Sequence, residues 1–229
     1  MTEQELKEIQ EMPKVILHVH IDGSGRAETV YKWLKEQGKD VTLEEVKQEL
    51  MLAKDWRGDL NKYLQKFALP LEVLQTEEHI EQATYELFED LAKQNVIYAE
   101  VRFAPSLHTR EGLSYNKIVE AAIRGMNKAK KDFGIDGNLI LCCMRGEDNT
   151  ISNLQTVAVA KEYLNDEKNP NKGVCAIDLA GAEKKYPTKQ FGYIFKIAKQ
   201  ANVPFTIHAG EAERTRKYKR CNRNAEQVE

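Results

Sequence analysis

Two histidines separated by one residue lie in an apolar run near the start of the chain. The run covers residues 15–20, Val-Ile-Leu-His-Val-His, so His18 and His20 flank Val19. In a β-strand, residues i and i+2 face the same side, which places both imidazoles on one face, about 7 Å apart along the strand. Two neutral imidazoles so placed can bind one cation, and imidazole suits Zn²⁺. Histidines at a strand end can equally be polar surface, so the pair alone leaves metal binding open.

Other groups that could do chemistry also follow short apolar runs. They are Asp22 after the first run, Gly181 after the run at 173–179, and His208 and Glu211 at and beyond the end of the run at 203–208. In parallel α/β folds, ligands collect at the carboxyl ends of the strands. The grouping therefore favours a metal-dependent site. A metal beside a carboxylic acid favours hydrolysis, because the metal lowers the pKa of water and the acid delivers a proton.

The elements that must position these residues alternate along the chain. Apolar runs of strand length occur at 15–20, 97–103, 139–144, 173–179 and 203–208. Stretches with apolar residues at three- and four-residue spacing occur at 77–94, 115–133 and 188–201. This alternation predicts a parallel α/β sheet with helical crossovers. Strands that are apolar almost throughout indicate a sheet covered on both faces or closed into a barrel.

The first crossover is unusually long. Residues 27–75 contain three predicted helices, at 27–36, 42–51 and 60–67, where an ordinary return between strands needs far fewer residues. An insertion of this size beside the first strand is a candidate lid.

Composition excludes several classes of protein. The 229 residues are 41% hydrophobic and 31% charged with a net charge of −2, which excludes collagen-like and simple disordered chains and gives no electrostatic reason to expect nucleic-acid binding. No apolar run is long enough for a membrane helix, and the polar N-terminus lacks a signal peptide. The four cysteines are too few and too irregular for a disulfide framework. We expect a cytoplasmic chain without nucleic-acid or membrane partners, whose oligomeric state the sequence does not predict.

Three motifs resemble the adenosine deaminase family. They are Pro-Lys-Val-Ile-Leu-His-Val-His-Ile-Asp-Gly at 13–23, Asp-Leu-Ala-Gly at 178–181 and Thr-Ile-His-Ala-Gly-Glu-Ala at 206–212, and the resemblance extends over roughly residues 10–212. Segments 98–105 and 142–145 are similar to the second and third strands of that family. The resemblance implies a TIM-type (β/α)₈ barrel, here with about the first five βα units. Residues 1–212 would form this incomplete barrel, with a helical lid insertion at about 27–75.

The resemblance also implies an activity and a role for each site residue. The activity would be zinc-dependent hydrolytic deamination of adenosine and 2′-deoxyadenosine to inosine and ammonia, in purine salvage. The implied residues are zinc ligands His18, His20 and His208, substrate-binding His20, Asp22 for a ribose hydroxyl and Gly181 for the purine ring, and Glu211 as the acid at purine N1. Leu60, Tyr63 and Phe67 resemble the family's apolar lid, although their spacing is equally typical of a helix packed on a core.

Some family features are missing from these 229 residues. A sixth-strand Gly-His-Gly and an eighth-strand Asp-Asp pair are absent, and His79 and His108 do not lie at predicted strand ends. Ala182 and Gly146 replace an Asp and a His that are common in relatives. We therefore expect little or no turnover from this chain alone. Two alternatives are a related adenine or modified-adenine deaminase and a non-catalytic fragment that serves as a binding module.

The last residues differ in character from the rest. From Ala212 onward there are six Lys or Arg and three Glu, a net charge of +3, with no apolar periodicity. Residues 213–229 are thus a basic tail, either solvated or an interaction arm. When residues 213–218 are back-translated and the resulting codons are read one base later, they can encode Asn-Gly-Pro-Glu-Asn. This stretch is similar to the continuation of the family's sequence. This favours a single-base frameshift, which the coding DNA would contradict if no alternate frame restored the missing motifs.

Overall fold

The structure is a computed structural model that describes residues 2–52 and 60–212. Its first half contains α1 (Glu3–Glu11), β1 (Lys14–His20), α2 (Ala27–Glu36), α3 (Leu43–Leu50), α4 (Leu60–Leu64), the 3₁₀ helix η1 (Gln65–Phe67), α5 (Ala68–Val73), α6 (Glu77–Lys93) and β2 (Val96–Phe103). Its second half contains η2 (Pro105–Leu107), α7 (Tyr115–Phe133), β3 (Asp136–Met144), α8 (Thr150–Glu162), β4 (Val174–Ala180), η3 (Thr188–Phe191) and α9 (Gly192–Gln200). The predicted basic tail, 213–229, lies outside the described residues.

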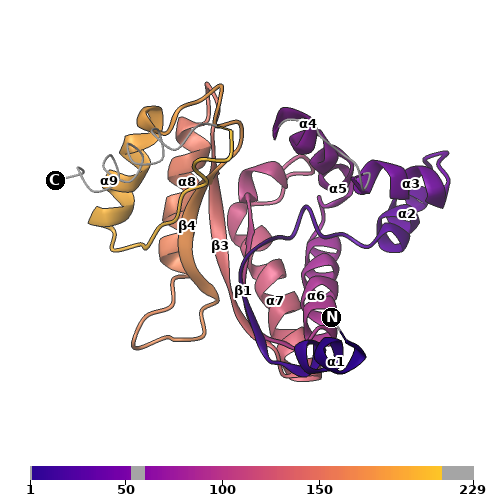
Figure 1. The fold of residues 1–229 in the computed structure, drawn as a ribbon. Helices are drawn as coiled ribbons and strands as arrows, with labels where there is room; N and C mark the ends of the chain where they lie inside the picture. Colours follow the sequence, from indigo (N-terminus) through magenta and orange to yellow (C-terminus); the bar gives the residue numbers. More distant parts are fainter. Residues whose placement is uncertain (1, 53–59, 213–229) are drawn as a thin grey trace.

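Four parallel strands form one sheet in the order β1-β2-β3-β4, joined by helical crossovers (Figure 1). In Figure 1, α1 lies at the end of the sheet where the strands begin and α4 at the end where they finish. Sequence order and spatial order coincide, as expected when each strand is followed by a crossover that returns the chain to the next position. The predicted parallel α/β class is confirmed.

The fifth predicted run lies alongside β4 but pairs with it only briefly. Phe205 forms an isolated parallel bridge with Ile177, and the amide of His208 donates to the carbonyl of Leu179 at 3.0 Å. Pro204 has no amide hydrogen, which removes one donor from this segment. The segment 203–208 therefore continues the order of the sheet as extended chain rather than as a full strand.

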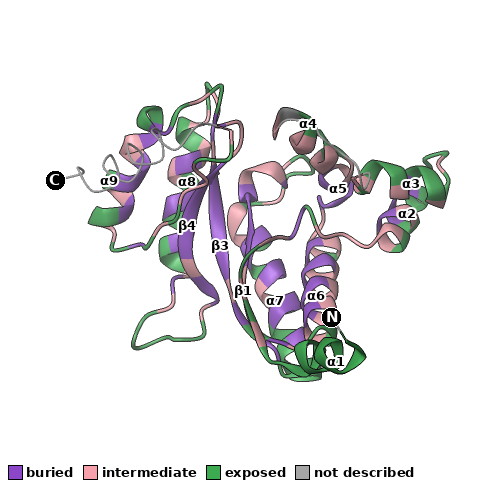
Figure 2. Cartoon of the chain, in the orientation of Figure 1, coloured by how far each residue is buried: buried purple, intermediate pink, exposed green. Residues whose placement is uncertain are grey.

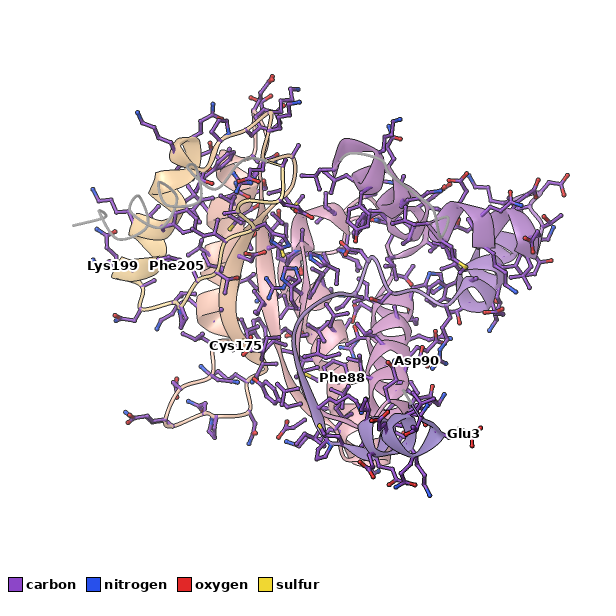
Figure 3. All side chains as sticks on the ribbon, in the orientation of Figure 1. Glu3, Phe88, Asp90, Cys175, Lys199 and Phe205 are labelled. Atoms are coloured by element: carbon purple, nitrogen blue, oxygen red, sulfur yellow. The ribbon has the colours of Figure 1, made fainter. Side chains whose placement is uncertain are left out.

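The core lies between the sheet and the helices that follow its strands, where buried residues concentrate (Figure 2). A close approach of α6 to β3 depends on Gly137, because a Cβ there would lie 2.5 Å from a ring carbon of Phe88 and 2.5 Å from the carbonyl oxygen of Ala99. Figure 3 shows Phe88 in the layer between α6 and the strands. Helix α1, in contrast, has no buried residue.

Helix ends follow local chemistry. Thr42 caps α3 through a reciprocal pair of bonds with Glu45, whose amide donates to the threonine hydroxyl at 3.2 Å and whose carboxylate accepts from the Thr42 amide at 2.7 Å. Helix α7 ends at Gly134, whose φ of 73° lies in the left-handed region that glycine adopts easily. The predicted helices at 27–36 and 115–133 have the observed bounds, and the predicted helix at 60–67 divides into α4 and η1.

Within the described ranges, every helix is too short or too polar to cross a lipid bilayer.

Candidate active site

Three imidazoles from two distant parts of the chain meet at the carboxyl end of the sheet. The Nε2 atom of His20 lies 3.2 Å from Nε2 of His18 and 3.2 Å from Nε2 of His208. His18 and His20 come from alternate positions of β1, and His208 comes from the segment beside β4. Among the residues the structure describes, these three form the only group of His, Cys, Asp or Glu side chains placed to hold a metal ion.

The spacing of the three imidazoles suits zinc. Zinc–nitrogen bonds of 2.0–2.1 Å in tetrahedral geometry place ligand nitrogens about 3.3 Å apart, close to the distances observed. Burial, together with the neighbouring imidazoles, lowers the pKa of His20 to about 3, and burial also lowers the pKa of His18. Both rings are therefore neutral at physiological pH, the form in which imidazole binds a metal. The donor set fits the Zn²⁺ predicted from the sequence.

A buried ion pair lies directly behind the histidines. Asp178, on β4, has no exposed side-chain surface, and its Oδ2 contacts the Nδ1 of His208 and lies 3.4 Å from Nη1 of Arg102. Its Oδ1 accepts a hydrogen bond from the hydroxyl of Thr206 at 2.9 Å. Burial alone would raise the pKa of Asp178, but His208 and the charge of Arg102 outweigh it and hold the pKa at about 2. Asp178 is therefore an anion behind the imidazole cluster.

The segment that carries His208 is anchored by a second buried arginine. Arg145, which follows β3, donates from Nη2 to the carbonyl of His208 at 2.6 Å and to the hydroxyl of Thr188 at 3.1 Å. Its Nη1 donates to the carbonyl of Tyr186 at 2.8 Å. Backbone contacts of this kind fix the segment without using the imidazole, which remains directed at the cluster.

A cavity of about 840 Å³ opens in front of the histidines. It is lined by all six site residues predicted from the sequence, namely His18, His20, Asp22, Gly181, His208 and Glu211. The volume lies in the range of small-molecule sites. No Lys or Arg is among the described residues that line it.

Asp22 and Gly181 have unusual environments in this cavity. Asp22 is 4% exposed, its Oδ1 has no hydrogen-bond partner, and burial raises its pKa to about 7. A buried carboxylate oxygen without a donor is costly, and a ligand hydroxyl would satisfy it. Gly181 has a φ of 104°, a conformation that side-chain-bearing residues rarely adopt, so the backbone itself forms the wall at that point.

The predicted lid residues lie over the same cavity. Leu60, Tyr63 and Phe67 all line it. The rings of Tyr63 and Phe67 meet edge to face with centroids 5.4 Å apart, and Phe67 lies 6.1 Å from the ring of His20. These three side chains of α4 and η1 therefore line the cavity that contains the histidine cluster, and Phe67 lies nearest to His20. Residues 53–59 of the predicted lid insertion lie outside the described residues.

The other two histidines lie elsewhere. His79 stacks on Trp33 with centroids 4.3 Å apart, and its Nδ1 donates to the carbonyl of Val73. His108 is fully buried, its Nδ1 donates to the carbonyl of Leu74 at 2.7 Å, and burial lowers its pKa to about 4. Neither contributes to the imidazole cluster.

The sequence motifs included Asp178 but gave it no role of its own, and the buried Arg102, Arg145 and Glu183 were given no role either. For Arg102 and Arg145 the available signal was a charged residue inside or directly after an apolar strand, because a charge is rarely buried there unless it is paired.

The sequence is similar to that of known proteins. The family model for adenosine deaminase matches residues 13–224. The adenosine deaminase of Haemophilus ducreyi is 43% identical over 200 residues, which cover 86% of this chain and 57% of that protein. This chain thus spans somewhat more than half the length of that relative.

Solved structures agree in fold. An amidohydrolase from Burkholderia ambifaria with bound Zn matches with a TM-score of 0.78 and 25% identity, over 92% of this chain and 55% of its own. The N6-methyl-AMP deaminase of Arabidopsis thaliana matches with a TM-score of 0.76 and 26% identity, over 96% of this chain and 64% of its own. The four parallel strands correspond to part of such a TIM-type barrel. On the match over residues 13–224 and the identity to the Haemophilus protein, the chain belongs to the adenosine deaminase family of deaminating hydrolases.

Proposed function

We propose that this chain carries the zinc-binding and nucleoside-binding part of an enzyme that deaminates adenosine and 2′-deoxyadenosine to inosine and ammonia in purine salvage. The observation that carries the proposal is the convergence of three imidazoles on one point beside a buried carboxylate that lacks a donor. This combination provides a metal site and a hydroxyl-binding site in one cavity.

His18, His20 and His208 would hold the zinc. Bound zinc lowers the pKa of water and so supplies a nucleophile near neutral pH. Asp22 would accept a hydrogen bond from a ribose hydroxyl, which satisfies its buried Oδ1. The open backbone at Gly181 would lie against the purine ring. Glu211, at the cavity wall, would place a proton on purine N1 and thereby make C6 more electrophilic.

Residues 60–67 would act as a lid. Leu60, Tyr63 and Phe67 present apolar surface to the cavity, so a bound nucleoside would be shielded from water on that side. Exclusion of water strengthens each electrostatic interaction inside a site.

The fold similarity to an N6-methyl-AMP deaminase supports a second candidate, the deamination of a modified adenine nucleotide. A 5′-phosphate normally requires a cationic partner, and no Lys or Arg is among the described residues that line the cavity. The buried Asp22 would also repel the phosphate when ionised. A nucleoside is therefore the preferred substrate class.

Zinc content and adenosine turnover on the purified 229-residue chain test the proposal together. Bound zinc with inosine production would establish the activity in this chain alone. Bound zinc with adenosine binding but no turnover would support a chain that holds the metal and substrate and lacks further catalytic groups. Absence of zinc at saturating concentration would contradict the proposed metal site, and preferential conversion of N6-methyl-AMP would favour the second candidate.

A further inference from the structure

Arg102 lies between the two parts of the chain that supply the histidines. It is 4% exposed, and its Nη2 donates to the carbonyl of Leu17, the residue that precedes His18, at 2.7 Å. Its Nη1 lies 3.4 Å from Oδ2 of Asp178 and 3.4 Å from the hydroxyl of Thr206. One guanidinium thus connects β1, β4 and the segment 203–208.

Asp178 continues this connection to the imidazole cluster. Its Oδ2 contacts Nδ1 of His208, while its Oδ1 accepts from Thr206, two residues before His208. The far nitrogen of the same ring, Nε2, lies 3.2 Å from Nε2 of His20. The carboxylate and the cluster therefore occupy opposite sides of one ring.

The two contacts of Asp178 constrain the ring differently. A carboxylate can only accept hydrogen bonds, so its contact favours a proton on Nδ1 of His208 and leaves a lone pair on Nε2. The Thr206 contact fixes the backbone position of the ring. Arg102 neutralises the carboxylate and, through Leu17, holds β1 at a set distance from it. A carboxylate that orients a metal-binding histidine typically changes metal affinity when it is lost.

We propose that Arg102 and Asp178 are positioning residues that set the tautomer of His208 and hold it in register with His18 and His20. Neither residue is among those that line the cavity, so both would act through His208 and β1. The inference rests on the proposed metal site for its consequence, but the tautomer is a property of the metal-free chain.

Nitrogen-15 NMR of the histidine rings in the metal-free chain tests the tautomer directly. We expect His208 to carry its proton on Nδ1 in the wild type and to populate the Nε2-protonated form in Asp178→Asn, because an amide can donate to Nδ1 as well as accept from it. A wild-type His208 protonated on Nε2, or an unchanged tautomer in Asp178→Asn, would overturn the proposal. The wild-type spectrum alone shows whether His208 carries its proton on Nδ1, even if Asp178→Asn does not fold.

Zinc affinity tests the consequence. Competition with a chelator should show Asp178→Asn binding zinc roughly 10- to 100-fold more weakly than the wild type. Arg102→Lys keeps the charge, but a lysine cannot contact Leu17, Thr206 and Asp178 together. Its zinc affinity should therefore lie between that of the wild type and that of Asp178→Asn. The control is Thr84→Val, which removes a buried hydrogen bond to Ile80 within α6.

The control separates positioning from general destabilisation. Thr84→Val should lower the urea midpoint of unfolding and leave zinc affinity within about twofold of wild type, because small changes at one remote buried site do not reach the cluster. An equal loss of zinc affinity in Thr84→Val would contradict a specific role for the pair. Failure of the wild type to bind zinc would contradict the proposed function, while the tautomer measurement would still decide this inference.

Discussion

Glu183 accepts hydrogen bonds from the two backbone amides on either side of Glu211. Its Oε1 accepts from Gly210 at 2.9 Å and its Oε2 from Ala212 at 3.0 Å, and Glu183 itself is 5% exposed. Gly210 has a φ of 83°, so the loop turns sharply at that point. The proposed acid is thus carried on a short loop that a buried carboxylate holds from behind.

Glu183→Gln should loosen this loop. The two carboxylate oxygens of Glu183 each accept one bond, but a glutamine side chain has only one acceptor oxygen. Its NH₂ group would then lie opposite one of the two backbone N–H groups, and two donors cannot form a hydrogen bond. At least one of the Gly210 and Ala212 amides should exchange its hydrogen roughly tenfold faster, the effect of losing about 1.4 kcal/mol of local stability. Hydrogen exchange followed by NMR measures this, and Glu78→Gln, at an exposed position of α6, should change neither amide. Unchanged exchange in Glu183→Gln would contradict the role given to these bonds.

Loss of a single histidine of the cluster should abolish tight zinc binding. Removing His20, whose Nε2 lies 3.2 Å from both partners, leaves two ligands, and we expect His20→Ala to weaken zinc binding at least about 100-fold. The matched control is His79→Gln, since His79 lies against Trp33 and away from the cluster. Chelator competition should show the control within about twofold of wild type. Equal losses in both variants would contradict the proposed ligand set.

Much of this site could be predicted from the chain alone. The two-residue period of a strand placed His18 and His20 on one face, and parallel topology brought His208 to the same edge. The contact between Asp178 and His208 could not be predicted, because it depends on the register in which the segment 203–208 meets β4. The structure shows that register in the bridge between Phe205 and Ile177 and in the hydrogen bond from the His208 amide to the Leu179 carbonyl.

Helix α8 shows a different limit of sequence patterns. Its buried positions include the polar side chains of Asn153 and Thr156, so no apolar stripe marks it as a helix. The Asn153 side chain accepts from the Met144 amide at 2.7 Å and donates to the Met144 carbonyl at 3.0 Å, which ties α8 to the end of β3. A helix held by side-chain hydrogen bonds carries a weak periodic signal, whereas α6 and α7 carry a strong one.

Close packing at Gly137 predicts a stability difference between two glycine substitutions. Gly137→Ala would place a Cβ 2.5 Å from the Phe88 ring and from the Ala99 carbonyl, so we expect a loss of roughly 1–3 kcal/mol in the free energy of unfolding. Gly192→Ala is the control, because Gly192 has helical backbone angles and no atom within 4 Å of the added Cβ. It should be neutral or stabilising by up to about 1 kcal/mol. Urea unfolding measures both, and equal midpoints would contradict the packing described for α6 and β3.

The proposed apolar lid predicts a separation of substrate binding from metal binding. Phe67→Ala removes a ring that lines the cavity and lies 6.1 Å from His20, so nucleoside binding should weaken roughly tenfold while zinc affinity stays unchanged. Ile151→Ala, at an exposed position on α8, is the control and should alter neither. Isothermal titration of the zinc-loaded chain with an adenosine analogue gives the nucleoside affinity, and chelator competition gives the zinc affinity. A loss of zinc affinity in Phe67→Ala would show that the ring supports the histidines rather than the ligand.

Burial of His108 predicts how stability depends on pH. Its pKa is about 4 in the folded chain, against an ordinary value of 6.5, so the unfolded chain binds a proton between these values while the folded chain does not. The contribution of His108 to the free energy of unfolding is therefore fully present above pH 6.5 and is lost as the pH falls towards 4. At pH 5 the loss is about 2 kcal/mol. His108→Asn keeps a donor for the Leu74 carbonyl and removes the titration. Urea unfolding at pH 5 and pH 7.5 should show a smaller pH dependence in the variant than in the wild type, by about that amount. The same pH dependence in both chains would mean that His108 is solvated and titrates normally in the folded protein.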